Sequence, residues 1–78
     1  MIHHNLGDIF VNEGQLGQAI MEYVAELQSN PNSLPTHLNL AKTYEMAGLR
    51  DKSIEHYRII QLADPGNSDV RDALIRLR

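Results

Sequence analysis

The chain has 78 residues, no cysteine and a net charge of −3. Its length allows one small domain, and the lack of cysteine excludes both disulfides and thiolate metal sites. The negative charge argues against nucleic acid as a partner, because phosphate binding needs a concentration of lysine and arginine.

Two helices are predicted in the first half of the chain. The first covers residues 2–13, where apolar residues recur at helical spacing, and it ends before Gly14, a residue type that often ends helices in the left-handed conformation. The second starts after Leu16 and ends in the polar turn of residues 29–33, which contains Pro31.

Three more helices are predicted in the second half. One covers about residues 34–47, with Ser33 as its N-cap, and the next covers about residues 51–63. The last begins near Ser68, which we predict as its cap. No alternating strand pattern of useful length is present, so the predicted fold class is all-α with five helices.

Two stretches of the chain repeat one pattern. His3 to Gly14 and His37 to Gly48 can be superposed at a constant offset of 34 residues. A fixed period of this size is the signature of a repeat architecture, in which neighbouring units bury each other's apolar faces. The sequence therefore predicts a repeat scaffold.

The repeat resembles the tetratricopeptide repeat (TPR), a helix–turn–helix unit with the pattern W-x2-L-G-x2-Y…A-x3-F…P. Repeat one matches this pattern with Leu6, Gly7, Phe10, Ala19, Tyr23 and Pro31, and repeat two matches it with Leu40, Ala41, Tyr44, Ser53, Tyr57 and Pro65. The resemblance implies a right-handed α-solenoid of two helix–turn–helix hairpins plus a capping helix. Repeat one would cover about residues 1–33, repeat two about 34–67 and the capping helix about 68–78.

Small residues are expected where the two helices of a hairpin approach each other. Gly7 would lie opposite Ala19, and Ala41 would lie opposite Ser53, whose hydroxyl is expected to bond to a helix carbonyl. Together with Ala41, Leu40 and Tyr44 are expected to hold the second hairpin together, since aromatic rings fill the space around such a contact.

The last helix is expected to be a solvating cap. Its apolar stripe of Val70, Leu74 and Leu77 can pack on repeat two, whereas Arg71 and Arg78 stand where a further helix would need apolar residues. Ile75 is apolar and is expected to be exposed. It is either a lone surface residue or part of a surface that meets another molecule.

The resemblance implies that peptides bind in a concave groove lined by the first helix of each repeat. Helical spacing places these residues on that face: His4, Asn5, Asp8, Asn12, Leu38, Asn39, Lys42, Glu45, Met46, Asp72, Ala73 and Arg76. Leu38 and Met46 would form an apolar point, and Asn39 could bond to a peptide backbone. We expect a short peptide with some positive charge, the alternative being that this face is only a solvated surface.

The histidines suggest no metal site. His3 and His37 stand at equivalent positions, where the family often has tryptophan, and are expected to pack or hydrogen-bond between the two helices of their repeats. His56 is expected to lie far from the others, and His3 beside His4 without a second cluster is no zinc motif. Chelation of Cu(II) by the N-terminal Met1-Ile2-His3 is an alternative.

The sequence favours a binding protein over an enzyme. It contains no nucleophile with a base, no paired carboxylates and no phosphate loop, so we expect no catalysis and no cofactor. The first hypothesis is a soluble, cytoplasmic adaptor that binds a protein or peptide without membrane insertion, since no apolar run could cross a bilayer. The alternative is an assembly module that self-associates end to end or by helix exchange.

The alternative rests on the charge distribution. Residues 1–41 contain Asp8, Glu13, Glu22 and Glu26 with no lysine or arginine, whereas residues 42–78 contain all seven basic residues and six acidic ones. The two ends of the molecule should therefore differ in electrostatic potential.

Overall fold

The computed structural model describes residues 6–78, and within them every regular element is a helix. The five helices are α1 (Leu6–Asn12), α2 (Leu16–Ser29), α3 (Leu34–Met46), α4 (Arg50–Ala63) and α5 (Ser68–Leu77). The predicted all-α class with five helices is confirmed. The start of the first predicted helix, at residues 2–5, lies outside the described residues.

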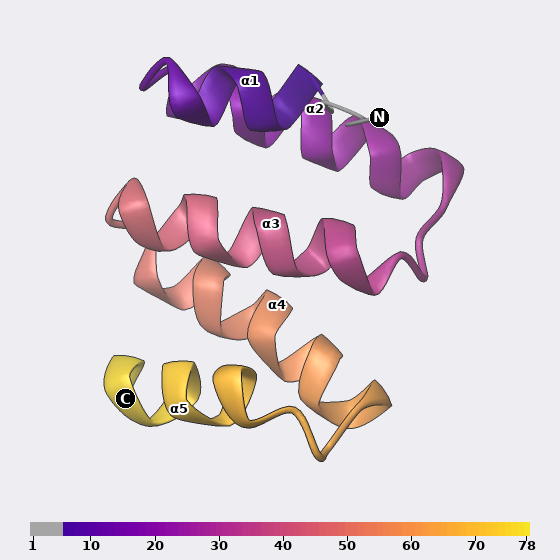
Figure 1. Ribbon diagram of the computed structural model, residues 1–78, viewed down its shortest axis with the longest axis vertical. Coiled ribbons are helices and arrows are strands. Elements are labelled where there is room, and N and C mark those ends of the chain that lie inside the picture. Colours follow the sequence, from indigo (N-terminus) through magenta and orange to yellow (C-terminus); the bar gives the residue numbers. More distant parts are fainter. Residues whose placement is uncertain (1–5) are drawn as a thin grey trace.

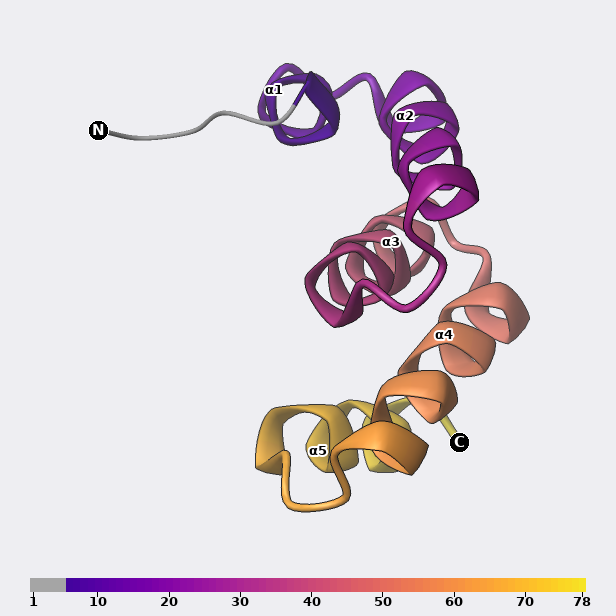
Figure 2. The same cartoon turned by 90° about the vertical axis from the view of Figure 1, so that its right-hand side faces the viewer.

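The helices stack in chain order, and each packs against the next (Figure 1). Seen from the side, α1, α3 and α5 lie toward one face, and α2 and α4 lie toward the other (Figure 2). The first face is concave, because α3 is set back between α1 and α5. This arrangement is that of a helical repeat array, in which the first helices of the repeats line the inner surface.

The turns after α1 and α3 have the same backbone geometry. Gly14 and Gly48 have φ angles of 76° and 80°, the left-handed conformation expected for both. The N–H of Gln15 donates to Phe10 O at 2.8 Å, and the N–H of Leu49 donates to Tyr44 O at 2.9 Å. These are Schellman bonds, which satisfy a free carbonyl at each helix end and turn the chain into the next helix.

The N-caps of α3 and α5 confirm one prediction and correct another. The Ser33 side chain accepts a hydrogen bond from the N–H of Thr36, as expected. The prediction of Ser68 as the cap of α5 is wrong. Ser68 is the first helical residue, and Asn67 is the cap, accepting from the N–H of Val70 at 3.1 Å. Asn67 stands one repeat after Ser33, and both side chains provide an acceptor for this bond.

The interior consists of two clusters. One is centred on the boundary between the repeats and contains Ala19, Tyr23, Leu40 and Tyr44. The other joins repeat two to α5 and contains Ala41, Tyr57, Ile60, Val70, Ala73 and Leu77. Leu40 and Tyr44 bury themselves against repeat one, and the Tyr44 ring also stacks against His56 of α4, so Tyr44 contacts the partner helix of its own hairpin as expected. The packed core lies between units, as in a repeat array.

The small residues allow close contacts within each hairpin. Ser53 Oγ donates to Ala41 O at 2.8 Å, which confirms the expected contact between these residues. In repeat one, the atoms nearest to the side-chain position of Gly7 belong to the ring of Tyr23. A Cβ atom on Gly7 would lie 2.6 Å from Cε1 of Tyr23.

Helix α5 packs as predicted. Val70 and Leu77 are buried, Leu74 is half-buried, and Ile75 is 53% exposed beside the exposed Arg71. Its apolar stripe therefore covers the end of repeat two while its arginines face solvent.

Candidate protein-binding groove

A hollow of about 370 Å³ lies between α1 and α3, the two helices that line the concave face in this part of the chain. Five of the predicted groove residues border it: Asp8, Asn12, Asn39, Lys42 and Met46. Val11, Tyr23 and Thr43 complete the lining. Two further predicted residues, His4 and Asn5, lie outside the described residues.

Two internal hydrogen bonds shape this hollow. The buried Tyr23 hydroxyl donates to Asp8 Oδ1, which ties α2 to α1. Burial, followed by the bond to Asp8, raises the pKa of the Tyr23 phenol well above its ordinary value. Thr43 Oγ1 donates to Asn39 O at 2.7 Å. The polar groups in the depth of the hollow are therefore already paired within the protein.

Asn39 and Lys42 are two polar side chains of this lining that form no hydrogen bond within residues 6–78. Asn39 is half-buried, and its side-chain amide forms no hydrogen bond within residues 6–78. Lys42 is exposed, and Met46 is 55% exposed, so an ammonium group and an apolar surface flank the amide. An Asn amide can donate and accept at once, which suits the N–H and C=O of an extended peptide.

Glu45 and Arg76, both predicted for the groove, bind each other. Arg76 Nη2 lies 2.8 Å from Glu45 Oε2, and Arg76 Nε donates to the same oxygen at 3.1 Å. The Tyr57 hydroxyl donates to Glu45 Oε1 at 3.2 Å. Burial, with Glu45 as the next cause, raises the pKa of Tyr57 to about 12. The pair joins α3 to α5 and lies outside the lining of the α1–α3 hollow.

The structure separates the other predicted groove residues. Leu38 packs against the second cluster and borders a different hollow, with Leu34 and Ile60, so it forms no shared apolar point with Met46. The assignment of Ala73 to the groove is wrong, because Ala73 is 3% exposed in the core. Asp72 is exposed on α5.

His37 and His56 form a contact that the sequence analysis missed. Their Nδ1 atoms lie 3.0 Å apart, and His37 Nε2 lies 2.8 Å from Pro31 O. The prediction that His56 lies far from the other histidines is wrong, whereas His37 does bond between the two helices of its repeat. The pairing of residues across the α3–α4 hairpin could have predicted this contact. If Ala41 lies opposite Ser53, then His37, about one turn earlier on α3, lies opposite His56, about one turn later on α4.

Two classes of site are not found among residues 6–78. No group of three or more histidine or acidic side chains is placed to hold a metal ion. In the same part of the chain, none of the helices combines the length and the apolar character that a membrane span requires.

A comparison with solved structures finds a similar protein, whereas comparisons with family models and with curated proteins find none. The crystal structure of MamA, a TPR-containing protein, superposes with a TM-score of 0.92 at 29% sequence identity. The match covers 97% of this chain and 44% of that chain, so the described protein spans less than half the length of its structural neighbour. The chain therefore has a TPR-type helical repeat fold, an architecture of protein-interaction and assembly modules.

Proposed function

We propose that the chain is a protein-interaction module that binds a short, extended peptide in the hollow between α1 and α3. The observation that carries this proposal is the half-buried side-chain amide of Asn39, which borders the hollow and has no hydrogen-bond partner within residues 6–78. An amide in this position can pair with one peptide unit of a ligand. A preformed surface of this kind lowers the ordering cost of binding.

The lining suggests which peptide would fit. Val11 and Met46 provide an apolar contact, and Asp8 and Lys42 carry opposite charges on the same hollow. Asp8 is the carboxylate in the lining of this hollow, and since Tyr23 donates to its Oδ1 atom, its Oδ2 atom would attract a basic side chain of the ligand. The proposed ligand is therefore an extended segment with an apolar residue for the hollow and a basic residue for Asp8.

Selection from a library of random displayed peptides tests this proposal. We expect selected peptides to bind the folded protein with an affinity that falls at least about tenfold in Asn39→Ala/Lys42→Ala, measured by fluorescence anisotropy. Circular dichroism should show unchanged helicity, since neither side chain is buried.

Gln28→Ala/Lys52→Ala is the matched control. It removes the same two functional groups, an amide and an ammonium, from exposed positions on α2 and α4, and should leave the affinity unchanged. Peptides that bind Asn39→Ala/Lys42→Ala as tightly as the unmodified protein would overturn the groove assignment.

A further inference from the structure

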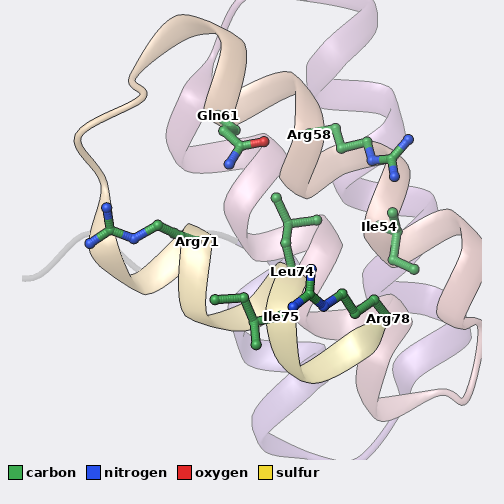
Figure 3. Close-up of a pocket in the computed structure, with 7 residues that line it drawn as sticks. All are labelled: Ile54, Arg58, Gln61, Arg71, Leu74, Ile75 and Arg78. Atoms are coloured by element: carbon green, nitrogen blue, oxygen red, sulfur yellow. The ribbon is translucent and has the colours of Figure 1, made fainter.

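A second hollow, of about 240 Å³, lies between α4 and α5 at the C-terminal end of the array (Figure 3). Its apolar part is formed by Ile54 of α4 and by Leu74 and Ile75 of α5. Ile75 is 53% exposed. The corresponding residue of repeat two, Ala41, is fully buried under α4. The hollow thus occupies the place where an array of this kind packs its next helix.

The charged residues around this hollow are all basic. Arg58, Arg71 and Arg78 line it together with Gln61, and none of the lining residues is acidic (Figure 3). None of these three guanidinium groups forms a salt bridge within residues 6–78. An apolar surface ringed by unpaired cations favours a partner surface that is apolar and acidic.

The opposite end of the same molecule has that character. Leu6 is 48% exposed, whereas Leu40, its equivalent in repeat two, is fully buried against repeat one. On α1 and α2, a hollow of about 210 Å³ is lined by Phe10, Gln18, Met21 and Glu22, with Met21 70% exposed. Glu22 is the acidic residue of this lining, and from residue 6 to residue 41 the chain carries no lysine or arginine.

We propose that this protein self-associates head to tail, with the α1–α2 end of one copy docked on the arginine-ringed hollow between α4 and α5 of the next. The occupant is a second copy because one chain supplies both complementary surfaces. The two ends lie at opposite extremes of the 28 Å long axis, so one molecule cannot join its own ends (Figure 1). A contact between two different surfaces is heterologous, and unless it closes into a ring it forms open chains.

Sedimentation velocity over a series from micromolar to millimolar concentration tests the proposal. We expect the average mass to rise continuously beyond that of a dimer at low salt, and to fall toward the monomer at high salt because screening weakens the charge pairing. A strictly monomeric species at millimolar concentration and low salt would overturn the proposal.

Charge reversal at either end identifies the surfaces. Gln18→Lys/Glu22→Lys blocks the first end, and Arg71→Glu/Arg78→Glu blocks the second. Each variant alone should stay monomeric. An equimolar mixture should assemble again beyond a dimer, with the two variants alternating, because the unmodified pair of ends and the reversed pair of ends are both complementary in charge. A chain with all four substitutions should also assemble, because its ends have exchanged charge and remain complementary.

Gln28→Glu/Asn32→Asp/Lys52→Glu is the control for net charge. It makes the same change in net charge as the arginine variant, at exposed positions outside both docking surfaces and outside the α1–α3 hollow, and it should assemble like the unmodified protein. Assembly that survives in either end variant alone, or a mixture of the two variants that stays monomeric, would overturn the head-to-tail arrangement. All variants are checked for unchanged helicity by circular dichroism. A variant that loses helicity is replaced by the variant with glutamine at the same positions. This glutamine variant should assemble more weakly than the unmodified protein. Assembly as strong as that of the unmodified protein would count against the proposal.

Discussion

The Nδ1 atoms of His37 and His56 lie 3.0 Å apart across the α3–α4 hairpin. Because the carbonyl of Pro31 can only accept, His37 Nε2 must donate to it. When the His37 imidazole is neutral, its Nδ1 atom then accepts a proton from His56 Nδ1, and this hydrogen bond needs no positive charge on either ring. Protonation of both rings would bring two N–H groups and two positive charges together.

This pair predicts that the protein loses stability in acid. Burial lowers the pKa of His56, and so do His37 and Lys52, whereas Glu55 raises it. A group whose pKa is lowered on folding contributes stability above its unfolded pKa, here 6.5, and this contribution is lost as the pH falls toward the folded value. Urea unfolding between about pH 7.5 and about pH 5 should therefore show a decreasing free energy of unfolding.

His56→Asn is the variant that isolates this effect. The Asn amide can still donate to His37 Nδ1 but does not titrate, so the loss of stability on acidification should be smaller than in the unmodified protein. An unchanged pH dependence in this variant would place the acid sensitivity elsewhere in the chain.

Gly7 is predicted to be intolerant of a side chain. In Gly7→Ala the new Cβ would lie 2.6 Å from Cε1 of Tyr23, so the ring must move and its bond to Asp8 is disturbed. We expect a loss of about 1–3 kcal/mol in the free energy of unfolding, measured with urea.

Gly17 provides the opposite case for the same substitution. It lies inside α2, and a Cβ there would meet no atom within 4 Å. Gly17→Ala should therefore raise the free energy of unfolding by up to about 1 kcal/mol, because alanine favours the helix. Equal effects of the two substitutions would show that the contact between Gly7 and Tyr23 is not tight.

The bond between Tyr57 and Glu45 predicts an alkaline titration. Burial and Glu45 raise the pKa of Tyr57 from 10.0 to about 12, so its contribution to stability is complete below pH 10 and is lost as the pH rises toward 12. Glu45→Gln should lower this pKa, whereas Arg76→Gln should raise it, since Arg76 now lowers it. Nuclear magnetic resonance of labelled tyrosine follows Tyr57 alone. Shifts of the same sign in both variants would contradict this arrangement.

The sequence by itself determined the local structure. The repeat of 34 residues follows from the spacing of residue types along the chain. The left-handed glycines at helix ends and the cap at Ser33 depend on the conformation of a few neighbouring residues. The structure confirms both the glycines and the cap. The same period would also have placed the last cap at Asn67. Residue type alone does not distinguish Ser68 from Asn67, because serine is as good a cap as asparagine.

Only the tertiary structure decided which side chains are paired and which remain available. Spacing on a single helix placed Glu45 and Asn39 on one face, but the position of α5 neutralises Glu45 with Arg76 and leaves the Asn39 amide unpaired among residues 6–78. Helical periodicity gives the direction of a side chain from its own axis and not the distance to the next helix. That distance depends on how the hairpins pack, and it brought His56 to His37.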